Sequence, residues 1–223
     1  LMVVHNGQVR LERYGLGFDA AGRWTSFSVA KSITSTLVGA AVRDGHIVAV
    51  GTAVEVMRLR GPDTRVVDLA GKTLGPGFID GHVHVSGGGG EAGFATRVPA
   101  PLLSRYTMAG VTSVVGLLGT DDATRSTAEL LSHVYALREQ GLSAWGYCGG
   151  YHVPPVTLTG SVRSDIALIE PLIGIGELAI SDHRSSQPTL DELLRLASEA
   201  HVAGLMSGKA GIVHLHLGDG KRG

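Results

Sequence analysis

The chain has 223 residues, 43% of them hydrophobic, and a formal net charge of −1. This composition predicts a globular protein with enough apolar residues for a sizeable core. The near-neutral charge, without a lysine or arginine cluster, argues against nucleic acid or a membrane as a partner and favours a small molecule. No apolar run approaches the length of a membrane span, and the single cysteine, Cys148, excludes an internal disulfide, so a cytoplasmic location is expected.

The first residues differ in character from the rest. The run Ser32 to Val42 predicts a helix of small and apolar residues. Just before it, Ser28 and Lys31 have the three-residue spacing that places a hydroxyl and an amine one helical turn apart. Such a lysine can accept a serine proton, although an N-cap serine beside a solvated lysine explains an isolated pair more simply.

The stretch Ser26 to Ile47 resembles the active-site helix of the serine β-lactamase and penicillin-binding family. The whole resemblance extends over residues 10–47 or so, and the later Tyr-x-Asn and Lys-Thr-Gly elements of that family are absent. We therefore interpret residues 1–43 as a β-lactamase-like fragment that is not an independent domain. Residues 44–75 are expected to form a small β segment, in which Asp44–Gly51 is a turn followed by a strand and Arg65–Leu74 is another strand and turn.

From residue 76 onward, apolar strand-like runs alternate with helical runs. Because the apolar runs do not alternate with polar residues, they are typical of parallel strands buried on both faces. The predicted fold class is α/β, with residues 76–223 forming part of a (β/α)₈ TIM-type barrel that has its chemistry at the C-terminal rim. Strands, about five of eight, are expected at Phe78–Val85, Thr112–Leu118, Leu142–Cys148, Gly174–Ile180 and Gly211–Leu217, and helices at Pro101–Ala109, Ala123–Glu139 and Thr189–Met206.

Two histidines stand at the end of the first of these strands. His82 and His84 are two residues apart, so both side chains point to one face and can bind one ion together. An isolated pair of this kind is more often a surface or packing feature. Here the pair follows a Pro-Gly entry and precedes a glycine run that carries the carboxylate of Glu91, which favours a metal site.

Further ligands are expected on the later strands. Glu177 lies in a buried strand, where an unpaired carboxylate is costly, so it should bind or bridge something. His216 lies near the end of the last expected strand and would complete a shell suited to Zn²⁺ or a related divalent ion. His214 could share its face, but the position of His216 before Leu-Gly-Asp makes His216 the better candidate.

Several motifs make the region from residue 76 recognisable. It resembles the isoaspartyl (β-aspartyl) dipeptidases of the amidohydrolase superfamily, and the small β segment from residue 44 fits that family too. The motifs are Pro76-Gly-Phe-Ile-Asp-Gly-His-Val-His84, Gly87-Gly-Gly-Gly-Glu-Ala-Gly93, Gly116-Leu-Leu-Gly-Thr120, Gly150-Tyr-His-Val-Pro154 and Ile180-Ser-Asp-His-Arg184.

The resemblance implies hydrolysis of β-aspartyl dipeptides by a hydroxide that bridges two zinc ions. It implies that His82 and His84 bind one ion, that His216 serves the other, and that Glu177 bridges them where some members carry a carboxylated lysine. A homo-oligomer is expected for the full-length family member.

The same resemblance assigns the substrate contacts. Glu91 would bind the substrate α-ammonium, and Thr120 would line the pocket. Tyr151 would polarise the scissile carbonyl, and Arg184 would hold a carboxylate.

The resemblance also implies two residues that lie beyond Gly223, namely a general acid/base aspartate on the eighth strand and a histidine on the sixth. The leading hypothesis is therefore a β-aspartyl dipeptidase represented by its N-terminal portion. A first alternative is an inactive partial barrel that retains metal or peptide binding, and a second is a serine hydrolase that uses Ser28 and Lys31.

Overall fold

The computed structural model describes residues 2–5, 8–12, 39–43, 46–70, 72 and 75–220, with side chains described from Ile47 onward. The chain divides into two compact units. The first comprises Leu1–Ile79 and Tyr106–Thr112, and the second comprises Asp80–Arg105 and Ser113–Gly223.

The first unit contains two antiparallel strand pairs. Strand β1 (Met2–His5) pairs with β2 (Gln8–Glu12), and β3 (Gly39–Arg43) pairs with β4 (His46–Gly51). The helix predicted up to Val42 is therefore wrong over its last residues, because cross-strand pairing with β4 overrides the helical propensity of the alanines in β3.

A short helix, α2 (Ala53–Met57), follows β4. Its first turn is closed by a capping box, in which the Thr52 hydroxyl accepts from the Glu55 N–H and the Glu55 carboxylate accepts from the Thr52 N–H. The strand predicted from Arg65 is wrong in its described part, since residues 65–70 form no strand.

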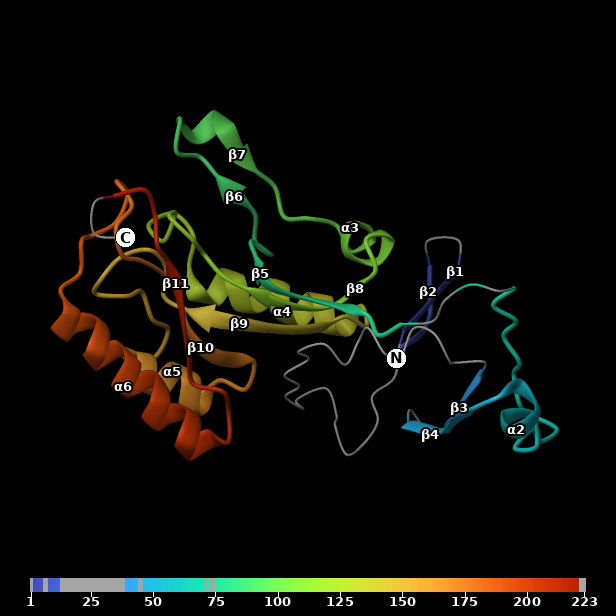
Figure 1. Cartoon of the computed structure of the whole chain (residues 1–223). Coiled ribbons are helices and arrows are strands. Elements are labelled where there is room, and N and C mark those ends of the chain that lie inside the picture. Colours follow the sequence, from blue (N-terminus) through green and yellow to red (C-terminus); the bar gives the residue numbers. More distant parts are fainter. Residues whose placement is uncertain are drawn as a thin grey trace. The chain divides into compact units, whose positions relative to one another are not determined.

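A five-stranded sheet, in the order β11-β10-β9-β8-β5, is the framework of the candidate site (Figure 1). The pairs β8–β9, β9–β10 and β10–β11 are parallel. This confirms the predicted α/β class, with five strands of a partial barrel. The strands are β5 (Phe78–Val83), β8 (Val111–Gly116), β9 (Ser143–Cys148), β10 (Leu172–Ala179) and β11 (Ile212–His216).

Four helices alternate with the strands of this sheet, and three of them lie where helices were expected. They are α3 (Leu103–Met108), α4 (Thr127–Glu139), α5 (Val162–Leu168) and α6 (Leu190–Ser207). Hydroxyl side chains cap the N-termini of the last three: Ser126, Ser161 and Thr189.

Two apolar clusters lie on opposite faces of the sheet. Strands β9 and β10 pack against α4, α5 and α6 in the larger cluster, which includes Cys148, Ile166 and Ile175. The smaller cluster includes Val115 and Tyr147. Because Tyr147 and Cys148 are consecutive in one strand, their side chains point to opposite faces.

Strand β5 differs from the expectation of a buried strand. Phe78 is 67% exposed and Ile79 is 70% exposed, whereas Val83 at its end is buried. The physical reason is that β5 is the edge strand of the described sheet. Its C-terminal end is nevertheless covered, and this end carries the histidine pair.

The glycine run folds back as a small hairpin between β5 and α3. Strand β6 (Gly88–Gly89) pairs antiparallel with β7 (Arg97–Val98), and a 3₁₀ turn, η1 (Phe94–Thr96), lies between them. Gly87 has a φ of +92°, and a Cβ there would lie 2.4 Å from the Val98 carbonyl oxygen. Glycine is therefore required where the loop approaches the returning strand.

Within the described residues, the helices are too short or too polar to cross a lipid bilayer.

Candidate metal and substrate site

The predicted ligands lie at the C-terminal ends of three strands of the sheet. His82 is near the end of β5, Glu177 lies in β10, and His216 is the last residue of β11. His84 lies just past the end of β5 rather than inside the strand. All of them belong to the second unit. The C-terminal edge of a parallel sheet is where βα loops place chemical groups.

The structure brings these ligands together. His82, His84 and Glu177 each offer one ligand atom, and these atoms lie within 4.8 Å of one another. The His82 Nε2 atom is 3.5 Å from Glu177 Oε2, and the His216 Nδ1 atom is 2.8 Å from Glu177 Oε1. The Glu177 carboxylate therefore lies between His82 and His216.

The donor atoms fit a cation. Glu177 is 3% exposed, and its Oε2 atom has no hydrogen-bond partner in the described structure. A buried carboxylate oxygen without a partner is costly, and a divalent ion bound to it would remove that cost.

The protonation of His84 supports the same interpretation. Burial, and next the neighbouring charge of His82, lower the pKa of His84, while Glu177 opposes this shift. The imidazole is therefore neutral at neutral pH. Neutral imidazole is the form that binds metal ions.

Two side chains without an assigned role, His214 and Asp182, make hydrogen-bond contacts with the candidate ligands. The His214 Nε2 atom lies 2.9 Å from His82 Nδ1, and its ring stacks on Tyr147 with 5.2 Å between ring centroids. The Asp182 Oδ2 atom lies 2.9 Å from His216 Nε2. The two-residue spacing of His214 and His216 was a usable signal for the first contact, whereas nothing in the sequence distinguished Asp182 within its motif.

The predicted substrate residues surround this cluster. The Tyr151 hydroxyl is 3.2 Å from His216 Nδ1, and its ring lies beneath the Arg184 guanidinium at 5.2 Å. Arg184 Nη1 donates to Glu91 Oε1 at 3.0 Å. The structure thus brings these three residues together beside the candidate metal ligands, and the ion pair between Arg184 and Glu91 is a contact that the sequence did not predict.

Tyr151 is held in a position to donate a hydrogen bond. It is 5% exposed, its N–H donates to the Gly119 carbonyl, and its own carbonyl accepts from the Ala179 N–H. Burial, and next the charge of Glu177, raise the pKa of Tyr151 to about 12. The phenol therefore keeps its proton across the neutral range.

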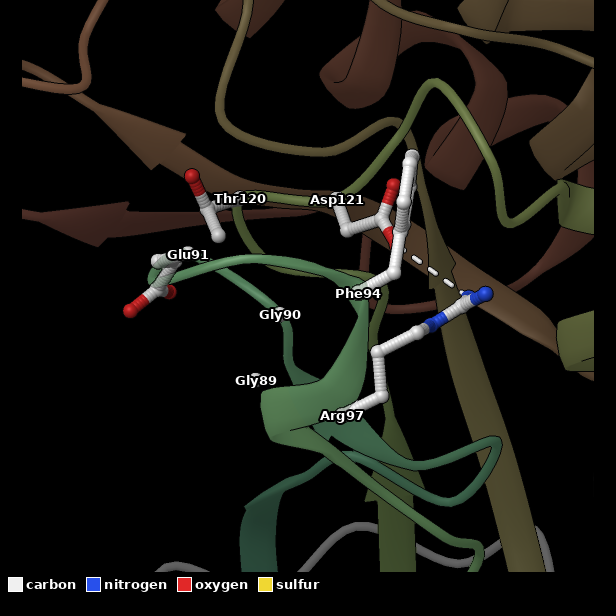
Figure 2. Close-up of a pocket in the computed structure, with 7 residues that line it drawn as sticks. All are labelled: Gly89, Gly90, Glu91, Phe94, Arg97, Thr120 and Asp121. Carbon is white, nitrogen blue, oxygen red and sulfur yellow. Dashed lines mark hydrogen bonds and ion pairs between the residues drawn. The ribbon is translucent and has the colours of Figure 1, made fainter.

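A pocket of about 210 Å³ lies beside the glycine hairpin, and Glu91 and Thr120 both line it. Figure 2 shows these two side chains close together, with the ion pair between Arg97 and Asp121 on the other side of the pocket. A hydrogen bond also holds the hairpin in place: the buried Arg125 donates through Nη2 to the Gly88 carbonyl at 3.2 Å.

The alternative site at Ser28 and Lys31 lies outside the described residues.

Comparison with solved structures gives a strong likeness. The chain is 57% identical to the β-aspartyl dipeptidase of the thermophilic, keratin-degrading Fervidobacterium islandicum AW-1 over 66% of its length, with a TM-score of 0.66. The same enzyme in complex with the β-Asp-Leu dipeptide gives a TM-score of 0.65. The match covers 40% of each solved chain.

Curated relatives match over shorter segments. The imidazolonepropionase of Symbiobacterium thermophilum is 41% identical over 92 residues, which are 40% of this chain and 21% of that protein. The N-substituted formamide deformylase of Arthrobacter pascens is 51% identical over 45 residues, 20% of this chain and 8% of that protein. No family model matches the chain.

These relatives share one superfamily, and the solved dipeptidase shares more than half of its aligned residues with this chain. The comparisons therefore confirm the resemblance of the chain to the β-aspartyl dipeptidases of the amidohydrolase superfamily.

Proposed function

We propose that the site belongs to a metal-dependent hydrolase that cleaves β-aspartyl dipeptides. The observation that carries the proposal is the ion pair between Glu91 and Arg184 beside Tyr151 and the His/Glu cluster. Glu91, which can accept from an ammonium group, and Arg184, which can donate to a carboxylate, thus lie at hydrogen-bond distance from each other next to the candidate metal ligands. A substrate with both charges close together matches this arrangement.

The metal ligands in this proposal are His82, His84, Glu177 and His216. Bound divalent ions, taken as two zinc ions, would supply Lewis acidity and a nucleophile at neutral pH. The negative charge of Glu177 would balance part of the charge of the ions. The apolar side chains around the strand of Glu177 would exclude water that competes with the ions for its carboxylate.

The remaining residues bind the peptide. The α-ammonium of the aspartyl residue would replace Arg184 as the partner of Glu91, and a substrate carboxylate would replace Glu91 as the partner of Arg184. The protonated phenol of Tyr151 would donate to the scissile carbonyl oxygen as negative charge develops on it. Cleavage adds one water across the C–N bond, so free aspartate and the second amino acid leave.

The chain spans 40% of the length of the solved dipeptidases, so turnover and peptide binding are measured separately. The zinc-loaded chain and the chelator-treated chain are each titrated with β-Asp-Leu by calorimetry and assayed for released leucine. The isomer α-Asp-Leu serves as the control ligand. Zinc-dependent cleavage of β-Asp-Leu, without cleavage of α-Asp-Leu, is expected, and a folded, zinc-loaded chain that does not cleave β-Asp-Leu contradicts the proposal.

Two further arms separate the alternatives. Binding of β-Asp-Leu without cleavage supports a partial barrel that retains only metal and peptide binding. Cleavage that survives chelation and is lost in Ser28→Ala supports the serine hydrolase. Preferential cleavage of imidazolonepropionate, suggested by the second group of relatives, would assign the site to a different substrate.

A further inference from the structure

Both ring nitrogens of His216 have carboxylate partners. Nδ1 is 2.8 Å from Glu177 Oε1, and Nε2 is 2.9 Å from Asp182 Oδ2. A neutral imidazole carries one ring proton, so it can donate to only one of them. Which carboxylate receives that proton decides whether the nitrogen that faces Glu177 is free to bind a metal ion.

The side chain of Asp182 is held in place by hydrogen bonds from Arg184. Arg184 donates to it from Nε at 2.7 Å, from Nη2 at 2.9 Å and from its backbone N–H at 2.9 Å. Asp182 is 4% exposed. The hydrogen bonds from Arg184 reach both carboxylate oxygens of Asp182, so the guanidinium and the carboxylate form a fixed ion pair.

An ionised carboxylate can only accept hydrogen bonds. The contact with Asp182 is made when His216 Nε2 carries the proton, and Nδ1, which has the Glu177 carboxylate at 2.8 Å and the Tyr151 hydroxyl at 3.2 Å, is then available to a metal ion. Metal-bound histidines commonly have this arrangement, in which a carboxylate accepts from the nitrogen that does not bind the metal.

We propose that Asp182 is a shared positioning residue, which fixes His216 in its Nε2–H tautomer for metal binding and aligns the Arg184 guanidinium for a substrate carboxylate. This rests on the proposed function for the roles of His216 and Arg184. Its consequence is that metal affinity and peptide affinity depend on the same buried carboxylate. Loss of this carboxylate weakens both, although Asp182 itself contacts neither ligand.

The chain provides a matched control. Asp122 also holds a histidine of the same rim, with its carboxylate oxygens 2.8 and 2.9 Å from His152 Nδ1. The Asp122 side chain is 8% exposed. His152 is not among the proposed metal ligands. The variants Asp182→Asn and Asp122→Asn therefore remove the same charge from the same kind of pair, and only the first affects a proposed ligand.

The first experiment measures zinc affinity by calorimetry, and then β-Asp-Leu affinity of the zinc-loaded protein. Asp182→Asn is expected to lose roughly 10- to 100-fold in zinc affinity, the usual effect of removing such an outer partner, and to bind β-Asp-Leu more weakly. Asp122→Asn is expected to match the wild type in both. Unchanged zinc affinity in Asp182→Asn, or a loss confined to zinc with full peptide affinity, overturns the shared role.

The second experiment does not depend on a variant that folds. The zinc-loaded wild-type chain, with ¹⁵N-labelled histidine, is examined by long-range ¹H–¹⁵N correlation, which identifies the protonated nitrogen of each ring. His216→Asn provides the assignment. The Nε2–H tautomer is expected for His216, and the Nδ1–H tautomer overturns the proposal.

These results separate the inference from the proposed function. The expected tautomer and the expected zinc loss, in a chain that neither binds nor cleaves β-Asp-Leu, uphold the metal-ligand half and overturn both the substrate half and the dipeptidase function. If the wild type cleaves β-Asp-Leu with zinc and Asp182→Asn keeps the wild-type affinities for zinc and peptide, the proposed function stands. The positioning role of Asp182 is then overturned.

Discussion

The Nδ1 atom of His216, from the last strand of the sheet, lies 2.8 Å from Oε1 of Glu177 in the neighbouring strand. The other carboxylate oxygen of Glu177 lies 3.5 Å from His82 Nε2, on the far edge of the sheet. One buried side chain therefore joins ligands that are separated by more than 130 positions in sequence. The proposed chemistry depends on this convergence.

Replacing Tyr151 with phenylalanine tests the role of its hydroxyl. The ring contacts with Arg184 and His216 should persist, because phenylalanine retains the ring. The donor to the scissile carbonyl is lost, so turnover of β-Asp-Leu by the zinc-loaded protein should fall by about 10²–10³. Steady-state kinetics measures this, and an unchanged kcat would remove Tyr151 from the reaction.

The same variant tests the pKa of this phenol through stability. The pKa of Tyr151 is about 12 in the folded chain against an ordinary value of 10. Between pH 10 and 12 the unfolded state has lost this proton and the folded state has kept it, so the free energy of unfolding should decrease as pH rises. Urea unfolding of the metal-free wild type should show a steeper decrease than Tyr151→Phe. Equal slopes would contradict the raised pKa.

Glu91→Gln tests recognition of the α-ammonium. The variant loses the negative charge but keeps the size of the side chain, so affinity for β-Asp-Leu should fall by roughly tenfold or more, the value of a charged hydrogen bond. N-acetyl-β-Asp-Leu, which lacks the ammonium, provides the comparison. The wild type should prefer the free amine, and the variant should not. An equal preference in both proteins would place the ammonium elsewhere.

Ile175→Ala tests the cluster that supports β10 beneath the site. Ile175 is fully buried among side chains of three helices. The cavity left by alanine should lower the free energy of unfolding by about 2–5 kcal/mol. Leu168→Ala, at a position that is 76% exposed, is the control and should change it by about 0.5 kcal/mol or less. A similar decrease in the free energy of unfolding in both variants would mean that this cluster does not determine stability.

The sequence predicted the strands and helices of the second unit well, because their apolar runs are long and separated by clear turns. For example, the strand expected at Gly174–Ile180 is β10 at Leu172–Ala179, and the helix expected at Thr189–Met206 is α6 at Leu190–Ser207. The exposure of Phe78 was not predictable in this way. An apolar run indicates a strand but does not tell whether that strand is at the edge of its sheet.

The first unit was harder to predict, since its elements are short and depend on pairing. The run Gly39–Arg43 has helical residues but forms a strand against β4. Helix α2 was missed although Thr52 and Glu55 carry the spacing of a capping box. In such short elements one hydrogen-bonded turn or one hairpin decides the structure, and average propensity is a weak guide.

The candidate site also combines residues that the sequence indicated with contacts that only the structure shows. His82, His84, Glu177 and His216 could be proposed from the sequence because each lies in or at the end of an apolar strand-like run, where polar residues are unusual. The ion pair of Glu91 with Arg184 joins two side chains of loops far apart in sequence, so no local pattern predicts it. The role of Asp182 likewise depends on two contacts that only the folded chain creates.

The zinc content of the folded protein, compared between wild type and Glu177→Ala, tests the central claim most directly. Both proteins are loaded with zinc, dialysed against metal-free buffer and analysed by mass spectrometry, with circular dichroism to verify folding. Glu139→Ala, an exposed change at the end of α4, is the control. The wild type and Glu139→Ala should retain zinc while Glu177→Ala retains only background. Equal zinc in all three proteins, or none in the folded wild type, would contradict the account.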